Sequence, residues 1–383
     1  MAAGKAETVA TLSWRQALAW RMRRHRLVER APAGEMLDVA GQICGLHAQV
    51  MSSAELTLWA RVDGMTPDAV QDALWRERSL VKLWAMRGTL HLLPSTEIGM
   101  WLAALGTYEH YLKPVWLRGF GISRKELERL ITTIGKALDS ELLTREELGA
   151  EVARLSRSKT IAERIQGSWG AYLKPASFRG LLCFAPGEGQ RVRFTTPANW
   201  LPGGVPEVDP DEALREVTRR YLGAFAPATR EDLGRWWAVS PAQARRMLEG
   251  LGDEAVEVDV DGGPCWMLAE DVTEAAGARK PPNIARLLPG FDQWAIGASR
   301  TAPAQLDPGH KARVYRPQGW ISPVLLVNGR MDGVWRHERK GARLIVEIEP
   351  FGKLPAWVRK QAGAEAGRLA EHLGADLEVT WSD

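Results

Sequence analysis

The hexapeptide Thr144-Arg-Glu-Glu-Leu-Gly149 returns later in the chain as Thr229-Arg-Glu-Asp-Leu-Gly234. In each copy an acidic residue, Glu147 or Asp232, follows the threonine by three positions. This is the pattern of a capping box, in which the two side chains satisfy the free amides that open a helix. A second helical pattern and a glycine-turned hairpin follow both copies. Helix, turn, helix and hairpin is the order of a winged helix, so the repeat predicts two such units in tandem.

The later unit is the clearer of the two. It predicts a helix over 230–237, a second helix over 241–250 capped by Ser240, and a hairpin over 256–268 that turns at Gly262 and Gly263. The earlier unit predicts helices over 146–155 and around 176–179, then a hairpin over 181–194. A looser third unit is expected before these, from helical periodicity at 12–23, 33–44 and 67–78 and a strand-like stretch at 81–93.

In the last quarter of the chain, strand and hairpin patterns predominate. Asn328-Gly329 lies between two apolar runs and is the signal of a type I′ hairpin turn. Another strand at 344–348, a helix at 355–373 and a final strand at 377–381 are expected. The fold class predicted is α+β: tandem winged-helix (helix-turn-helix) domains and a small β-rich C-terminal domain, a barrel or curled sheet. The expected boundaries are 1–120, 121–205, 206–280 and 281–383.

Composition narrows the functional classes. The net charge of the 383 residues is only +3, so any surface for nucleic acid must be local. Met1 to Thr11 lacks the apolar stretch of a signal peptide and no long apolar run follows, which predicts a cytoplasmic protein without a membrane contact. The isolated Cys44, Cys183 and Cys265 support neither a disulfide framework nor a zinc site. We expect no metal and no cofactor.

Local basic and aromatic positions are candidates for DNA contact. Arg191 and Arg193 lie two apart on an expected strand and share a face. A cluster at the end of the first helix could hold phosphates or could simply complement the helix dipole; its members are Arg21, Arg23, Arg24, His25 and Arg26. Most tryptophans are expected in the core, among them Trp59, Trp75, Trp84, Trp236 and Trp237. Trp320 could stack on a base, although a buried place at the start of a strand is the commoner alternative.

One short segment carries candidate chemistry. Gly45-Leu-His-Ala-Gln-Val50 interrupts the helical pattern between 33–44 and 53–61 and places His47 and Gln49 two residues apart. In an extended conformation such side chains point the same way, so an imidazole and a carboxamide could hold one water molecule. A pair of this kind is more often a hydrogen-bonding pair at a helix end.

At this point the chain resembles the winged-helix DNA glycosylases of the AlkZ and YcaQ type. The resemblance lies in segments that run in order along nearly the whole chain: Gly45 to Gln49 with 52–61, Met86-Arg-Gly-Thr-Leu-His-Leu92, Gly180-Leu-Leu-Cys-Phe184, Leu288-Pro-Gly-Phe-Asp292, Tyr315-Arg-Pro-Gln-Gly-Trp-Ile321 and 329–335. It implies a C-shaped cleft for duplex DNA and excision of alkylated bases. The family's catalytic signature is typically Gln-x-Gln or Gln-x-Asp, and His47 and Gln49 occupy those places, with histidine as a departure at the first.

No lysine is assigned as a nucleophile, which predicts a monofunctional enzyme that leaves an abasic site. The resemblance suggests that it removes bulky N7-alkylguanine adducts or interstrand crosslinks, in repair or in self-resistance to a DNA-alkylating toxin. Arg87, His91, Arg316 and Trp320 join Arg191 and Arg193 as expected DNA contacts, with a buried strand position as the alternative for His91. The expected partner is double-stranded DNA with alkylated bases, and the protein is expected to be a monomer. Two other classes stay open: a winged-helix transcriptional regulator, and a protein that binds adducts without cutting.

Overall fold

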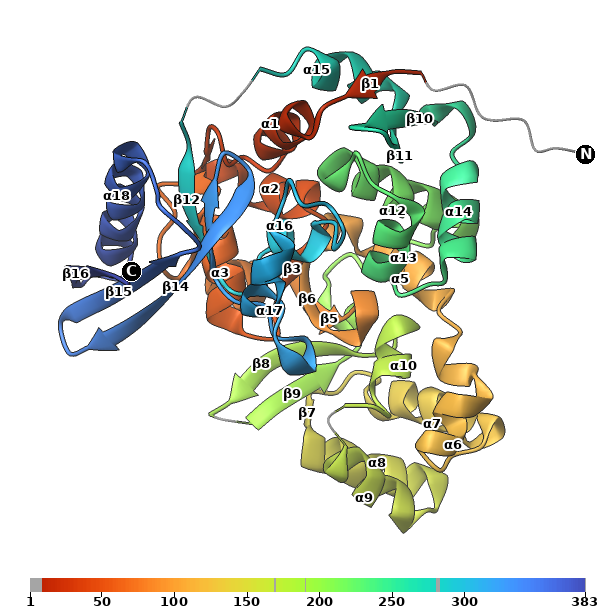
Figure 1. Ribbon diagram of the computed structural model, residues 1–383. Helices are drawn as coiled ribbons and strands as arrows, with labels where there is room; N and C mark the ends of the chain where they lie inside the picture. The colour runs from red at the N-terminus through yellow and green to blue at the C-terminus, as the bar shows by residue number, and fades with distance from the viewer. Residues whose placement is uncertain (1–8, 169, 190, 280–282, 383) are drawn as a thin grey trace, which may run out of the picture. The chain divides into compact units, whose positions relative to one another are not determined.

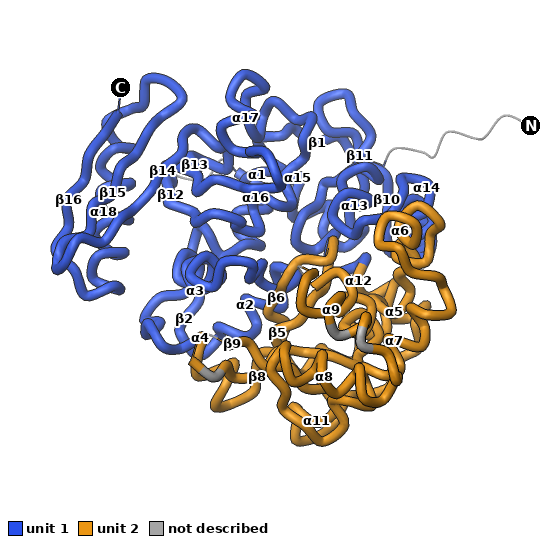
Figure 2. Tube along the Cα trace, turned by 90° about the horizontal axis from the view of Figure 1, so that it is seen from below, with its two compact units in different colours: residues 1–69, 218–383 blue, residues 70–217 orange. Residues whose placement is uncertain are grey.

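The chain folds into two compact units (Figures 1 and 2). The computed structural model describes residues 9–168, 170–189, 191–279 and 283–382. One unit combines the N-terminal residues up to 69 with residues 218 onward, and the other consists of residues 70–217. Helices and strands are mixed throughout both, and a β-sheet ends the chain. The α+β class is therefore confirmed.

The unit of residues 70–217 contains two small antiparallel hairpins among helices. The first hairpin pairs β5 (Leu80–Trp84) with β6 (Leu90–Pro94), and the second pairs β8 (Cys183–Glu188) with β9 (Arg191–Thr195). A short strand, β7 (Leu143–Thr144), extends the second hairpin. The helices of this unit are α5 (Ile98–Gly106), α6 (Pro114–Gly119), α7 (Arg124–Ala137), α8 (Arg145–Ser156), α9 (Lys159–Gly167), α10 (Lys174–Phe178) and α11 (Pro197–Trp200), with α12 (Pro210–Phe225) crossing the division between the units.

Both copies of the hexapeptide form the capping box that the sequence predicts. Thr144 begins α8 and accepts a hydrogen bond from the amide of Glu147, whose carboxylate bonds the Thr144 amide in return. Thr229 and Asp232 repeat this arrangement at the start of α13 (Arg230–Trp237). α9 is a helix that the sequence indicated only as a longer middle section.

The unit of residues 1–69 and 218–383 begins with short elements and continues into the later repeat. α13 is followed by α14 (Pro241–Glu249) and by a hairpin of β10 (Ala255–Val260) and β11 (Gly263–Leu268). The other elements before the C-terminal sheet are β1 (Thr11–Leu12), which pairs with β10, then α1 (Trp14–Arg24), β2 (Ala31–Pro32), α2 (Met36–Gln42), β3 (Leu46–His47), α3 (Met51–Trp59), β4 (Val62–Asp63) and α15 (Val272–Ala276). The predicted helix at 67–78 is interrupted, as α4 (Ala69–Gln71) gives way to a π-helical turn at Asp72–Arg76.

The C-terminal sheet has five strands in the order in which they occur in the chain. They are β12 (Ala285–Leu288), β13 (Val324–Val327), β14 (Arg330–Lys340), β15 (Arg343–Pro350) and β16 (Asp376–Trp381). The first four are antiparallel, and β16 joins β15 in parallel after α18 (Ala356–His372). α18 packs against both outer strands, β12 and β16 (Figure 1). The sheet is open, so the barrel alternative is wrong.

The turn between β13 and β14 is of the kind that the sequence predicts. Asn328 has φ 51° and Gly329 has φ 88°, the left-handed pair that a type I′ turn needs. A Cβ atom on Gly329 would lie 2.9 Å from the Cβ of Leu18 in α1. Glycine is required here both for its conformation and for the close approach of α1.

Four of the five tryptophans named as expected core residues are buried. Trp59, Trp84, Trp236 and Trp237 are buried, whereas Trp75 is only half-buried. Within the described ranges, the helices are too short or too polar to cross a membrane.

Candidate active site

The His47 segment forms a tight connection between α2 and α3. Cys44 and Gly45 have φ values of 62° and 80°, and the Gly45 amide bonds the carbonyl of Ala40 at 2.8 Å. Left-handed backbone at this place ends α2 and turns the chain sharply. His47 then lies in the extended pair β3, and Gln49 lies at a bend just before α3. The interruption of the helical pattern predicted from the sequence is confirmed.

His47 and Gln49 lie in different environments. The His47 side chain is 5% exposed and stacks on the ring of Phe291, with centroids 4.7 Å apart and an interplanar angle of 11°. Gln49 is exposed. A neutral carboxamide in water offers both donors and an acceptor. The pair thus combines an imidazole whose ring is held against an aromatic face with an amide open to a ligand or a water molecule.

Three consecutive residues after β12 contact the region that carries these side chains. Phe291 stacks on His47, and the side-chain amide of Gln293 donates a hydrogen bond of 2.6 Å to the carbonyl of Gly45. Asp292 forms a bidentate ion pair with Arg61, just beyond the end of α3, at 2.7 Å on both oxygens. Both charged side chains are fully buried. Asp292 also accepts from the Trp294 amide at the start of α16 (Gln293–Gly297).

His25 completes this buried network. Its Nε2 lies 2.9 Å from the Ala224 carbonyl and its Nδ1 lies 3.4 Å from the Arg61 guanidinium. The guanidinium can only donate, so Nδ1 accepts and the neutral ring carries its proton on Nε2. Burial, and then the positive charges of Arg61 and Arg21, hold the pKa of His25 well below its ordinary value of 6.5.

This network predicts a pH dependence of stability. Below about pH 6.5 His25 is protonated in the unfolded chain but stays neutral in the folded chain. The stability that His25 contributes is therefore present above that pH, and it is lost as the pH falls toward the lower pKa of the folded state. We expect the free energy of unfolding to fall by up to about 1.4 kcal/mol per pH unit from this group. Urea unfolding at several pH values measures it. His25→Gln should flatten the curve more than His372→Gln; equal slopes in wild type and His25→Gln would contradict the assignment.

Arg316 and Trp320 lie on an exposed loop of the same unit. The Arg316 amide bonds the Trp320 carbonyl at 2.8 Å, and Gln318 and Gly319 between them have φ values of 60° and 76°. Trp320 is 48% exposed, and its ring meets Phe291 edge-on at 4.9 Å. The alternative of a buried strand-start tryptophan is therefore wrong. An exposed ring can stack on a base.

The remaining candidates for DNA contact lie in the unit of residues 70–217. Arg191 is exposed on β9, and Arg193 is half-buried, donating to the Pro186 carbonyl at 2.8 Å. Arg87 is half-buried in the turn between β5 and β6, with φ 60°. His91 is 1% exposed on β6, and its Nδ1 lies 3.0 Å from the Thr89 carbonyl. The buried alternative therefore describes His91 better than a surface contact.

The basic cluster at the end of α1 is largely internal. Arg21 is buried and donates to the carbonyls of Phe225, Ala226 and Pro227, and His25 is buried as described above. Only Arg23 and Arg24 are exposed, with Arg26 half-buried. Arg21 and His25 are therefore no surface contacts, because they satisfy the backbone carbonyls at 224–227. A phosphate contact by Arg23 and Arg24 stays a prediction, as does their complementation of the helix dipole.

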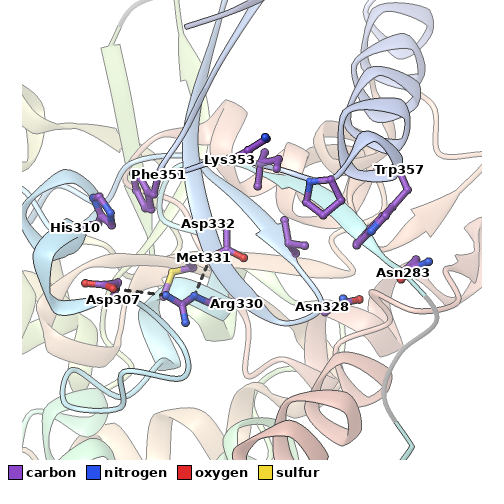
Figure 3. Close-up of a pocket in the computed structure, with 14 residues that line it drawn as sticks. Asn283, Asp307, His310, Asn328, Arg330, Met331, Asp332, Phe351, Lys353 and Trp357 are labelled. Atoms are coloured by element: carbon purple, nitrogen blue, oxygen red, sulfur yellow. Dashed lines mark hydrogen bonds and ion pairs between the residues drawn. The ribbon is translucent and has the colours of Figure 1, made fainter. Parts of the chain in front are cut away.

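Two cavities lie elsewhere in the same unit as His47. One of about 450 Å³ is lined by polar groups of the C-terminal sheet region (Figure 3), where Arg330 pairs with Asp332 at 2.8 Å and with Asp307 at 3.7 Å. The other, of about 730 Å³, lies where Arg368 covers the ring of Trp59. None of the predicted site residues lines either cavity. The side chains of Cys44, Cys183 and Cys265 are buried. In the described ranges, histidine, cysteine and carboxylate side chains form no metal-binding group of three.

The fold and the His47 segment match one family of enzymes. The family described as AlkZ-like DNA glycosylases matches residues 40–372, so the chain belongs to that family. The interstrand DNA cross-link repair glycosylase of Streptomyces sahachiroi is 40% identical over 370 residues, which cover 94% of this chain and 97% of that protein. The solved structure of Streptomyces sahachiroi DNA glycosylase AlkZ has a TM-score of 0.87 at 37% identity, covering 97% of this chain and 100% of that one.

Proposed function

We propose that this protein is a monofunctional DNA glycosylase that hydrolyses the N-glycosidic bond of alkylated purines. The observation that carries the proposal is the exposed Gln49, two residues after the stacked imidazole of His47, in a chain similar over nearly its whole length to a cross-link repair glycosylase. Bulky N7-alkylguanine adducts and interstrand crosslinks are the proposed substrates, by analogy with that relative. An enzyme of this kind would serve repair or self-resistance to an alkylating toxin.

The chemistry suits a neutral pair of side chains. A purine alkylated at N7 carries a positive charge, so its glycosidic bond already has a good leaving group and breaks with cation character on the sugar. The enzyme then has to place a water molecule and stabilise charge. Gln49 would orient the water at C1′ through its amide. His47 would take the water's proton as general base or hold the water while neutral. Without a lysine nucleophile the product is an abasic site in an uncut strand.

Three winged-helix domains are proposed to supply the DNA surface. Residues 1–120, 121–205 and 206–280 would form them, ahead of a C-terminal β domain at 281–383, and together they would frame a C-shaped cleft for duplex DNA. The helix and hairpin order of α8, α10, β8 and β9, and of α13, α14, β10 and β11, supports the second and third domains. The protein is proposed to act as a monomer, without metal or cofactor, in the cytoplasm.

Base release tests the proposal directly. Purified protein is incubated with duplex DNA that carries one N7-alkylguanine, and the strand is analysed with and without alkali. We expect release of the alkylated base and strand cleavage only after alkali. Cleavage without alkali would exclude a monofunctional enzyme. Tight binding to damaged duplex without release would favour an adduct-binding protein, and sequence-selective binding to undamaged duplex without release would favour a regulator.

Arg191 is expected to contact a phosphate. It is exposed on β9, so Arg191→Ala should weaken binding to duplex DNA of any sequence and should lower the slope of log K against log salt by about 1. Fluorescence anisotropy over a range of salt concentrations measures both. Arg154→Ala is the matched control, because Arg154 is exposed on α8 and paired with Glu151. Equal salt slopes for the two variants would remove Arg191 from the interface.

A further inference from the structure

We propose that Phe291 is a positioning residue: it fixes the plane of the His47 ring, and its neighbour Gln293 anchors the loop that carries that ring. The inference rests on the proposed function, because it assigns the support of the same catalytic pair. It concerns the segment Phe291 to Gln293, which contacts the segment of His47.

The stack orients the His47 ring. The rings of His47 and Phe291 are nearly parallel, at 11° and 4.7 Å, and both side chains are buried. Parallel stacking covers one face of the imidazole and sets the direction of its edge, where its two nitrogens lie. A flat partner thereby limits rotation of the ring about its side-chain bonds, whereas an aliphatic partner of similar volume would not.

The backbone of Phe291 is strained. Its φ is 58°, a left-handed conformation that a bulky side chain rarely adopts. The Ile321 carbonyl lies against this backbone: the Phe291 amide bonds it at 3.3 Å, and a Cβ on Gly290 would lie 3.1 Å from the same oxygen. The surroundings therefore force the strained conformation that directs the Phe291 ring onto His47.

The neighbours of Phe291 hold the chain at two further points, one before and one after His47. Gln293 is buried and its amide holds the Gly45 carbonyl, two residues before His47. Asp292 holds Arg61, just beyond α3. Three successive residues thus contact the chain at Gly45, at His47 and at Arg61, beyond α3. Preorganisation of this kind matters because small displacements of a catalytic group cost large factors in rate.

The test is Phe291→Leu, with Phe291→Tyr as the conservative variant and Phe351→Leu as the matched control. Phe351 stacks on His310 in the same unit with centroids 4.3 Å apart and rings 9° from parallel. In single-turnover base release we expect Phe291→Leu to lower the rate constant by about 10- to 100-fold, with little change in DNA affinity. Phe291→Tyr should keep most of the rate, and Phe351→Leu should match wild type.

A double-variant cycle separates positioning from a general structural defect. If Phe291 acts through His47, Phe291→Leu should cost nothing further in a His47→Ala background. Multiplication of the two losses would overturn the proposal, as would an unchanged rate in Phe291→Leu.

A second readout does not depend on activity. In NMR spectra of histidine-labelled protein, the ring protons of His47 should be shifted upfield by the Phe291 ring current, and Phe291→Leu should abolish that shift while Phe351→Leu moves only His310. Unmoved His47 signals in Phe291→Leu would overturn the proposal. Loss of the shift in a protein whose wild type releases no base would leave the positioning intact and would refute the proposed function instead.

Discussion

Gln49→Ala should lower the single-turnover rate of base release by about 10²- to 10³-fold, the loss typical of removing one preorganised polar group from a transition state. Gln49 is exposed at the bend before α3, so its amide can meet a water molecule at the sugar without rearrangement of the fold. It carries no charge, so its loss should leave DNA affinity nearly unchanged. The rate constant is measured with enzyme in excess over duplex carrying one N7-alkylguanine.

Gln42→Ala is the matched control for Gln49→Ala. Gln42 is an exposed glutamine at the end of α2, a few residues before His47. The Gln42→Ala variant should release base at the wild-type rate. Wild-type release by Gln49→Ala would refute the role of the carboxamide. An equal loss in both variants would indicate damage to the loop rather than to the chemistry.

His47→Gln distinguishes the two roles left open for the imidazole. It recreates the Gln-x-Gln pattern typical of the family and removes a titrating group. If His47 only positions water, the variant should keep most of its activity over the same pH range. If His47 is the general base, release should fall by about 10²- to 10⁴-fold, and the acid limb of the pH profile due to His47 should disappear.

The local elements were predictable because their signals are local. A capping box needs only a threonine and an acidic residue three positions later, and a type I′ turn needs only Asn-Gly between two apolar strands. Both hexapeptide copies and the Asn328-Gly329 turn form as the sequence indicates. The tight connection at His47 was visible for the same reason, since an interrupted helical period marks it.

The surroundings of the site could not be predicted from sequence, because they depend on pairing between distant segments. Arg61 and Asp292 lie far apart in the sequence, and nothing near either residue predicts that the two charges meet in the core. In the sequence Arg21 and His25 indicate a basic surface, whereas in the fold both side chains are buried and bond the carbonyls at 224–227. Phe291 illustrates the same limit: only the fold shows that a residue far along the chain stacks on His47.

The buried ion pair predicts the largest effect on stability. Asp292→Ala should lower the free energy of unfolding by about 3–5 kcal/mol, because it leaves the fully buried guanidinium of Arg61 without its carboxylate. It also removes the acceptor of the Trp294 amide. Asp292→Asn keeps that acceptor and should lose less. Urea unfolding followed by tryptophan fluorescence measures each variant.

Two further variants make this prediction specific to a buried pair. Glu378→Ala removes the partner of Arg343 in an exposed pair between β15 and β16, and should cost less than about 1 kcal/mol. The double variant Arg61→Met with Asp292→Leu removes both charges and should recover much of the stability lost by Asp292→Ala, because no charge is then left uncompensated in the core. If the double variant is as unstable as Asp292→Ala, loss of packing rather than an unpaired charge dominates. If the double variant recovers stability, its rate of base release shows whether the ion pair also helps to hold the segment that carries His47 and Gln49.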